Sequence, residues 1–363
     1  MSSTQTLLDV LRSHSKVDCD TFDHEAAPIS SYCIGRDVID VWGLDHQAIA
    51  YGELARLDAN GGALHAELIS SAVAYAQSHH AQHAGVGLAE FAVEVMMVKL
   101  ALRIVPYLTS YSHIQTNPMY SYNKDKTIEN AKRMCLNPSI VCPQASPRQQ
   151  CTRSIVAIFK DLDPKYDAKR VCIKIPATWE GMQACRELEK QGIATLATTM
   201  FCLEQAALAS HAGCTYIAPY INELRVHFDE TYVDENKAFD FCGAAQRYYE
   251  KTDSRTQVLP ASLTSIQEVM MLAGAHHITV SPPLLKKLAE TPANPWEGDT
   301  GSVFSSASDS AFADYSAVLD DESAWRLAFT RSANGQSEEK IIQAINIFCE
   351  KQERLEELVS AHK

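Results

Sequence analysis

One lysine interrupts a short apolar run in the middle of the chain. The run Val171–Ile175 is typical of a buried strand, and Lys174 stands near its end. Pro176 then ends the strand, and an amphipathic helix is predicted to follow over Trp179–Lys190. Burial favours the neutral form of an amine, and a neutral amine attacks carbonyl carbons to form a Schiff base. The alternative is a lysine whose ammonium group reaches water at the strand end.

The residues after this lysine resemble a known Schiff-base segment. Lys174-Ile175, followed after two residues by Thr178-Trp179-Glu180-Gly181 and a helix, is similar to the corresponding segment of the transaldolase family. Further similar segments are Gly192-Ile193, Phe201, Gln205-Ala206, Ala212-Gly213, Ile217–Tyr220, Ala261-Ser262, Leu272–Ala275, Leu284–Leu288 and Asp321–Ser323. The resemblance implies a class I aldolase that binds a small carbonyl substrate covalently on Lys174. It implies no metal and no cofactor, because the iminium itself accepts electrons.

The composition is that of a soluble globular protein. The chain has 363 residues, of which 46% are apolar and 21% charged, enough for a large core. The net charge of -13 argues against a nucleic-acid partner, which would require a basic patch. No window approaches 18 continuous apolar residues, so no membrane-spanning helix and no membrane partner are predicted.

Cysteine usage indicates a reducing compartment. The 11 cysteines are scattered, form no C-x-x-C pair and in several cases lie in apolar contexts, where a free thiol behaves as a small hydrophobe. The first residues lack the basic stretch and apolar run of a signal peptide. The expected location is therefore cytoplasmic. The oligomeric state cannot be read from these features, and a homodimer is one option.

Short β-branched runs alternate with helical patterns, which predicts a parallel sheet built from βα units. The predicted strands are Lys16–Asp20, Val38–Trp42, Ser112–Thr116, Val171–Ile175, Thr195–Met200, Thr215–Pro219, Gln257–Ala261 and Ile278–Ser281. Eight strands with helices between them are the count of a closed barrel. The predicted fold is therefore α/β, a (β/α)8 TIM barrel with extra N-terminal and C-terminal helices.

Seven helices are predicted from apolar periodicity and capping signals. They are Ala63–His79, Leu88–Val105, Lys126–Met134, Thr178–Lys190, Leu203–His211, Ser265–Ala273 and Glu338–Val359. We interpret residues 1–363 as one barrel domain, with residues 320–363 forming a helical tail. In the transaldolase fold such a tail packs on the barrel, and the resemblance implies the same here.

Chemistry in a barrel gathers at the C-terminal ends of its strands. Asp20 ends the first strand, and the resemblance implies that it transfers a proton during cleavage of a carbon–carbon bond. The alternative is a cap for the following turn. His46 stands where the family has a substrate-binding asparagine, so His46 is a predicted substrate-binding residue. It could donate a hydrogen bond, act as an acid or base near neutral pH, or only cap a helix.

The third, fifth and sixth strand ends resemble the fructose-6-phosphate aldolase subgroup. Gln115 stands at the position of the transaldolase glutamate that works through a water molecule, and glutamine can hold that water but cannot exchange a proton with it. Thr198 matches the threonine that shares the water. Tyr220 stands where those aldolases have tyrosine and is a candidate acid, with simple packing as the alternative. Asn117 and Ala218 are predicted substrate contacts beside them.

The two arginines with which the family binds phosphate are absent. Glu223 stands at the first arginine position and Thr264 at the second. Because a charge-assisted hydrogen bond contributes about 1.5–3 kcal/mol, sugar phosphates are expected to be poor substrates. Ser262 and Thr264 are predicted to bind substrate instead. Arg225 is the alternative source of a cation.

The predicted function is transaldolase-like aldol or retro-aldol chemistry through a Schiff base on Lys174, with a non-phosphorylated carbonyl substrate. Three alternatives stay open. The protein could be an ordinary transaldolase of the pentose phosphate pathway, or an iminium-forming cyclisation or condensation enzyme of secondary metabolism. It could also be a barrel that binds a partner without catalysis, although binding alone does not require Lys174, Asp20 and Thr198 together.

Overall fold

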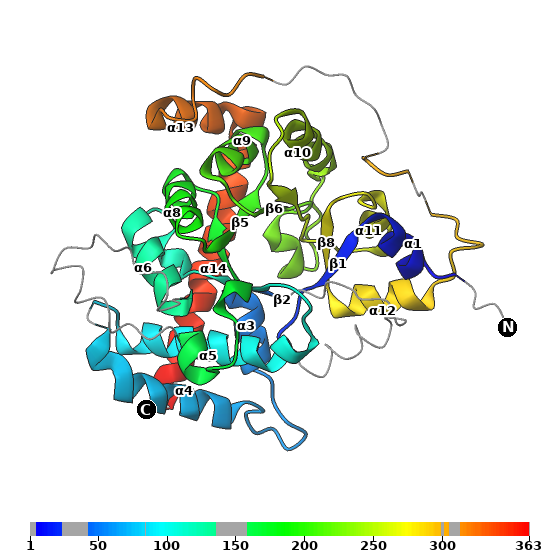
Figure 1. The fold of residues 1–363 in the computed structure, drawn as a ribbon. Coiled ribbons are helices and arrows are strands. Elements are labelled where there is room, and N and C mark those ends of the chain that lie inside the picture. The colour runs from blue at the N-terminus through cyan, green and yellow to red at the C-terminus, as the bar shows by residue number, and fades with distance from the viewer. Residues whose placement is uncertain are drawn as a thin grey trace.

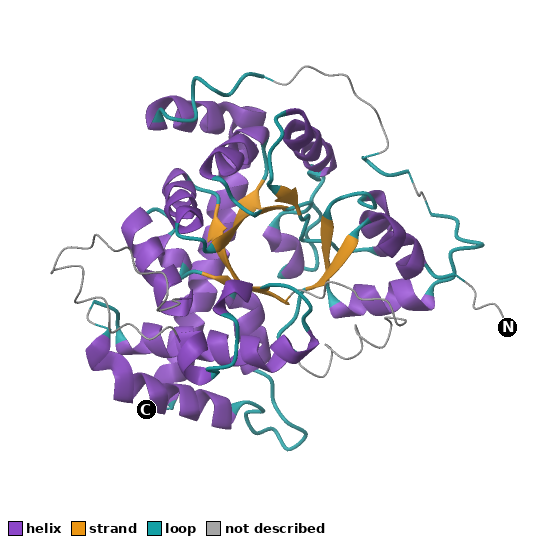
Figure 2. Ribbon diagram, viewed as in Figure 1, coloured by secondary structure: helices purple, strands orange, loops and turns teal. Residues whose placement is uncertain are grey.

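The computed structural model describes residues 5–23, 43–83, 85–135, 158–298, 301–304 and 313–362. Its centre is a parallel sheet of eight strands, in the order β7-β6-β5-β4-β3-β2-β1-β8. Figure 1 shows these strands surrounded by helices, and Figure 2 shows them as a ring. The strands are β1 Lys16–Cys19, β2 Gly43–Asp45, β3 Ser112–Gln115, β4 Val171–Pro176, β5 Ala194–Met200, β6 Tyr216–Pro219, β7 Gln257–Val258 and β8 His277–Val280.

The ring is completed between β7 and β8, the two ends of the strand order. β1 pairs with β8 in parallel register, from Lys16 opposite His277 to Cys19 opposite Val280. β7 is the shortest of these strands, and a backbone hydrogen bond from Thr279 N–H to Pro260 O (3.0 Å) connects the segment after it to β8. The predicted (β/α)8 barrel is therefore confirmed, with extra helices at both ends of the sequence.

The second strand differs from the prediction. The predicted segment Val38–Trp42 lies outside the described residues, and the strand between β1 and β3 is Gly43–Asp45. Three residues with one apolar side chain give no alternating pattern, so the sequence offered little signal for this strand. Its position matters because the strand delivers His46, the next residue, to the C-terminal rim of the barrel.

The helices form the outer layer of the barrel (Figure 1). The α-helices are α1 Leu7–His14, α3 Gln47–Leu54, α4 Ala66–His79, α5 Leu88–Ile104, α6 Lys124–Cys135, α7 Ile158–Leu162, α8 Trp179–Lys190, α9 Leu203–Ala212, α10 Phe239–Lys251, α11 Ile266–Met271, α12 Pro282–Glu290, α13 Glu322–Arg331 and α14 Gln336–Ala361. Short 3-10 helices are η1 His80–Gln82, η2 Val105–Tyr107, η3 Pro118–Tyr120, η5 Ala168–Arg170, η6 Leu224–His227 and η7 Ser332–Gly335. All seven predicted helices are present to within a few residues. None of the helices in the described ranges is long and apolar enough to cross a membrane.

The barrel interior contains an unexpected polar layer. His277 Nδ1 lies 3.3 Å from Asp18 Oδ2, and its Nε2 lies 2.9 Å from Gln257 Oε1. The ring of Tyr216 packs against both His277 and His113, with centroids 5.3 and 5.7 Å apart. Barrel interiors are usually filled by branched apolar side chains. Burial, together with the nearby charges of Lys174 and His277, lowers the pKa of His113 well below its usual value, so this ring is neutral.

Helix α14 crosses the rim at which the parallel strands end. In Figure 1 it passes close to α3 and α5, in agreement with its contacts. The ring of Phe348 packs on His46 with centroids 4.9 Å apart, and Lys351 Nζ lies 5.0 Å from the ring centre of Phe228. Lys340 places its ammonium group 3.1 Å from Asp234 and 2.8 Å from the Asn236 carbonyl. The C-terminal tail therefore packs on the barrel beside the strand ends.

Replacing Lys340 with methionine should destabilise the protein by about 3–5 kcal/mol, because it leaves the buried Asp234 carboxylate without its cation. Urea denaturation of the variant measures this loss. Arg354→Met is the matched control on the same helix: its partner Glu357 is exposed, so the stability should stay close to that of the wild type. A loss below about 1 kcal/mol for Lys340→Met would show that this ion pair does not anchor the helix.

Candidate active site

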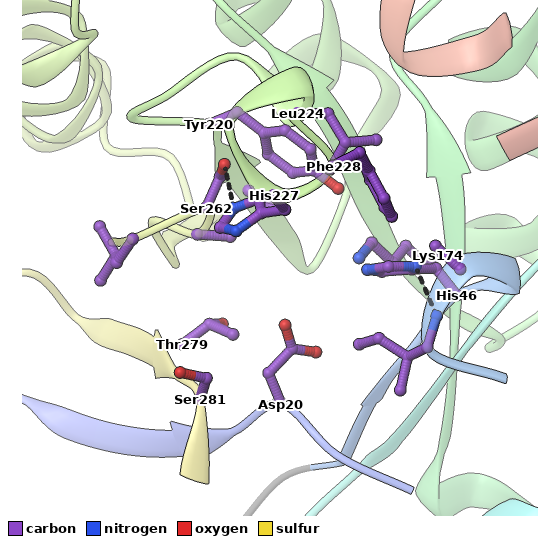
Figure 3. A pocket seen from close by; sticks show the side chains of 15 residues that line it. Asp20, His46, Lys174, Tyr220, Leu224, His227, Phe228, Ser262, Thr279 and Ser281 are labelled. Carbon is purple, nitrogen blue, oxygen red and sulfur yellow. Dashed lines mark hydrogen bonds between the residues drawn. The ribbon is translucent and has the colours of Figure 1, made fainter. Parts of the chain in front are cut away.

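A cavity of about 290 Å³ opens at the C-terminal ends of the strands. Figure 3 shows its side chains converging from several strand ends and from the loops that follow them. The lining residues are Asp20, His46, Ala48, Ile49, Lys174, Ala218, Tyr220, Leu224, His227, Phe228, Ala261, Ser262, Leu263, Thr279 and Ser281. This is the end of the barrel at which enzymes of this architecture carry their chemistry, and the volume suits a small substrate.

Lys174 is held in the wall of this cavity by β4. The strand pairs with β3 and β5, with Gln115 and Leu196 opposite Lys174, and only 2% of the lysine is exposed. The turn into α8 is tight: Thr178 caps the helix by accepting from Gly181 N–H (2.9 Å). A Cβ atom on Gly181 would lie 2.1 Å from the Pro176 carbonyl oxygen, so this position requires glycine. The structure thus buries the predicted lysine at a rigid strand end.

Asp20 follows β1 and faces the same cavity (Figure 3). Its carboxylate oxygen Oδ1 is buried and has no hydrogen-bond partner within the described part of the chain. Loss of water around the carboxyl group raises its pKa to about 6, and the positive charge of Lys174 acts in the opposite direction. A carboxylate in this state binds protons near neutral pH and can exchange one with a substrate hydroxyl.

Thr198 and Tyr220 form a hydrogen-bonded pair beside the lysine. Thr198 Oγ1 donates to Tyr220 Oη (3.3 Å), and Lys174 Nζ lies 5.9 Å from the centre of the Tyr220 ring. β5, the strand that contains Thr198, is irregular here. Its register with β6 shifts between Ala197 and Met200, and Thr199 has a φ of 57°. A β-branched residue in the left-handed region is strained, and such strain clusters at functional sites.

His46 both caps α3 and lines the cavity. Its Nδ1 accepts from Ile49 N–H (3.4 Å), so the proton of the neutral ring resides on Nε2. Burial, with contributions from Lys174 and His227, lowers the pKa of His46 well below its usual value. The ring is therefore neutral at physiological pH and offers the cavity a hydrogen-bond donor.

Gln115 and Asn117 point to a different place. They line a second, much smaller cavity of about 10 Å³ between β3, α5 and α6, the room that one water molecule needs. Gln115 Nε2 donates to Gln47 Oε1 (2.9 Å), and its own Oε1 has no partner among the described atoms. Asn117 caps η3 through Met119 N–H (3.0 Å). Neither side chain lines the larger cavity.

The positions of the family arginines supply no cation to the cavity. Glu223 lies behind the rim, where it accepts from Tyr232 Oη (2.8 Å) and lies 3.7 Å from Lys340. Thr264 is exposed and bonded to Glu268, and it does not line the cavity. Arg225 points to solvent and pairs with the Asp229 carboxylate at 2.7 Å. Of the predicted substrate contacts, Ala218 and Ser262 lie in the wall and Thr264 does not.

Nine further lining residues were not predicted as site residues from the sequence: Ala48, Ile49, Leu224, His227, Phe228, Ala261, Leu263, Thr279 and Ser281. Thr279 and Ser281 belong to the end of β8, where the rule that barrel sites gather at strand ends could have found them. His227 lies in η6, between a strand and a helix, and no sequence pattern marked it. Its imidazole Nε2 lies 2.9 Å from Ser262 Oγ.

No group of three or more metal-binding side chains is found in the part of the chain that the structure describes. The cavity instead brings together one amine, one carboxylate and several hydroxyls. Within the described lining, Lys174 is the one lysine or arginine. Such a set can form an imine with a ketone or aldehyde and move protons around it.

Comparison with known proteins shows the family of the chain. The family model for transaldolase/fructose-6-phosphate aldolase matches residues 60–359. The transaldolases of Chlamydia caviae and Chlamydia felis are each 42% identical to the chain over 128 residues, 34% of this chain and 39% of theirs. The match therefore spans well under half of those relatives. A solved protein from Coccidioides immitis, proposed to be a fructose-1,6-biphosphate aldolase, is 10% identical, covers 94% of this chain and 98% of its own, and has a TM-score of 0.39, too low to support a conclusion. On the strength of the family match, the chain belongs to the transaldolase/fructose-6-phosphate aldolase family.

Proposed function

We propose that the protein is a class I aldol enzyme that binds a ketone as a Schiff base on Lys174 and makes or breaks the neighbouring carbon–carbon bond. The observation that carries this proposal is the position of Lys174. Its amine is buried at a strand end, faces a cavity of about 290 Å³ and shares that cavity with the Asp20 carboxylate. A buried amine without a bonded carboxylate is suited to attack on a carbonyl carbon.

The reaction begins with attack of the neutral Lys174 amine on the ketone carbon. Loss of one water molecule and uptake of one proton give the iminium ion. In the cleavage direction, Asp20 takes the proton of the hydroxyl two carbons from the iminium carbon, the carbon–carbon bond breaks and an aldehyde leaves. The electron pair of that bond forms the carbon–carbon double bond of an enamine on Lys174, and the π pair of the iminium moves to its nitrogen. The enamine is then protonated and hydrolysed, or it attacks a second aldehyde.

Thr198 and Tyr220 are proposed to move protons and hold water around the iminium, and Gln115 has a different part. The Thr198–Tyr220 hydrogen bond lies beside Lys174, so Tyr220 Oη can donate to a water or to the enamine carbon. Gln115 is paired in register with Lys174, although its side chain turns toward Gln47. We therefore assign Gln115 a positioning part at the small second cavity.

We further propose that the substrate carries no phosphate. A phosphate bears up to two negative charges and is usually bound by guanidinium groups, which form paired hydrogen bonds. The cavity offers no arginine among its described residues, and its one lysine is assigned to the carbonyl. Arg225 is engaged by Asp229 and does not line the cavity. The substrate class that fits is a neutral polyhydroxylated ketone with a neutral aldehyde partner.

A competition between acceptors tests the substrate class. With dihydroxyacetone as the donor, kcat/KM for D-erythrose is expected to exceed that for erythrose 4-phosphate by about tenfold or more, because the phosphate loses water on entering the cavity without gaining a cation there. A preference for the phosphate of similar size would instead make the protein an ordinary transaldolase, the function that the names of the Chlamydia relatives favour. The adduct on Lys174 is common to both outcomes.

A further inference from the structure

The cavity wall contains a hydrogen-bonded histidine–serine pair that takes no part in the Schiff-base mechanism. His227 Nε2 lies 2.9 Å from Ser262 Oγ, and both residues line the cavity. Figure 3 shows the pair on the side of Tyr220, apart from Lys174 and facing the space above Asp20. The His227 ring is exposed at the mouth, and Ser262 is part-buried beneath it. The pair is therefore placed to meet the end of a substrate that extends outward from the lysine.

The backbone at Ser262 is held in an unfavourable conformation. Its φ is 62°, in the left-handed region that favours glycine. The Asn222 side chain fixes this conformation by donating to the Ser262 carbonyl (2.8 Å), while Asn222 N–H donates to the same oxygen (3.3 Å). Strain maintained in this way is typical of ligand-binding positions. Its effect here is to hold the Ser262 hydroxyl in the cavity wall, within reach of His227.

The pair is electrically neutral. Loss of water on the side of the ring that packs against the cavity wall lowers the pKa of His227, and the Glu268 carboxylate partly offsets this effect. Glu268 itself is bonded to Lys237 (2.6 Å) and to Asn222 (3.1 Å), so it leaves no free charge for a ligand. A neutral imidazole and a hydroxyl together offer one donor and one acceptor, the pattern that a hydroxyl group satisfies. A phosphate would require donors and positive charge instead.

We propose that His227 and Ser262 form the subsite for a hydroxyl group on the distal carbons of the substrate, with His227 as the specificity-determining residue. This proposal rests on the proposed function, since it takes Lys174 as the point where the carbonyl is held. It names the ligand class as a neutral polyol chain of the aldehyde partner.

The test compares a hydroxylated acceptor with one that lacks these hydroxyls. Dihydroxyacetone is the donor, and the ratio of kcat/KM for D-erythrose to kcat/KM for butanal is measured. The proteins compared are the wild type, His227→Phe, Ser262→Ala and the double variant. Each single variant should reduce the preference for erythrose by about two- to tenfold, the range expected for the loss of one neutral hydrogen bond. The double variant should lose no more than about a further twofold, because the two groups act as a pair. Activity on butanal should change little.

Two further readouts separate this subsite from the chemistry at Lys174. Borohydride trapping of dihydroxyacetone on Lys174 should be the same in all four proteins, since neither side chain contacts the lysine. Binding of erythritol, a polyol without a carbonyl, is followed by saturation-transfer NMR and should weaken in His227→Phe even if no adduct forms. An unchanged erythrose preference together with unchanged erythritol binding would overturn the subsite. A selective loss of erythrose 4-phosphate use in His227→Phe would also overturn it, by making the pair a phosphate site.

Discussion

Lys174→Met is expected to abolish carbon–carbon bond chemistry, with kcat/KM falling by about 10⁴-fold or more, because no other group in the cavity can form the covalent intermediate. Methionine is similar in length to lysine and apolar, so the buried position should accept it. The folded protein should therefore remain, which circular dichroism and the thermal midpoint can verify. The activity is measured as the release of aldehyde from a ketose or as its reverse.

The matched control is Lys286→Met, a lysine on α12 whose side chain is 63% exposed and which, among the described residues, pairs with Glu290 at 3.9 Å. It should retain the wild-type rate, so that the loss in Lys174→Met is traced to one amine and not to the change of residue type. Retention of more than a tenth of the wild-type activity in Lys174→Met would mean that the reaction does not pass through this lysine.

Asp20→Asn is expected to lower kcat by about 10²–10⁴-fold, the usual contribution of a positioned acid or base. Asparagine keeps the shape of the side chain but cannot take a proton, so binding of the ketone at Lys174 should persist. Borohydride trapping should accordingly still label Lys174 in the variant. A variant that lost trapping and turnover together would show that Asp20 supports the lysine and not the bond-breaking step.

The pH dependence of kcat/KM provides a second test of the role of Asp20. The pKa of Asp20 is raised to about 6 in the folded protein, so kcat/KM for cleavage should rise with pH through about 6 and this limb should vanish in Asp20→Asn. The raised pKa also means that ionisation of Asp20 opposes folding: the cost builds up as the pH rises from 3.8 to about 6 and is complete above that range. Asp20→Asn should thus stabilise the protein at pH 8, by up to about 3 kcal/mol, and the gain should shrink as the pH falls toward 4.

The barrel could be predicted because most of its strands are buried short runs that end in turn residues. β4 and α8 follow the sequence to within one residue, since Pro176, the Thr178 cap and Gly181 each have a local physical effect. The strand before His46 could not be placed in this way. It has three residues, and its pairing with β3 depends on the rest of the barrel.

Part of the site could be predicted because several of its residues stand at the ends of strands. Lys174, Asp20 and Tyr220 stand at strand ends, which the order of the chain brings to one rim. His227 and Ser262 are 35 residues apart in loops, and their contact depends on how those loops fold. The polar layer of Asp18, His113 and His277 was missed because single polar residues inside apolar runs give no sign of which neighbours they will meet.

The geometry also bears on His46 as a new acid or base. Its Nδ1 is occupied by the helix cap and its ring is buried and neutral, so it lacks a free acceptor to serve as a base. This arrangement favours a hydrogen-bond donor to the substrate. It gives no support to a cyclisation enzyme in which His46 supplies new chemistry.

Borohydride reduction can trap the covalent intermediate that we propose on Lys174. The protein is incubated with dihydroxyacetone and, separately, with fructose 6-phosphate, reduced, and digested for peptide mass analysis. We expect a reduced adduct of dihydroxyacetone on the peptide that contains Lys174, and little or no adduct of fructose 6-phosphate. Adducts from both would restore phosphate binding while keeping the lysine. Absence of any adduct on Lys174, or an adduct on another lysine, would show that the Schiff base does not form on Lys174.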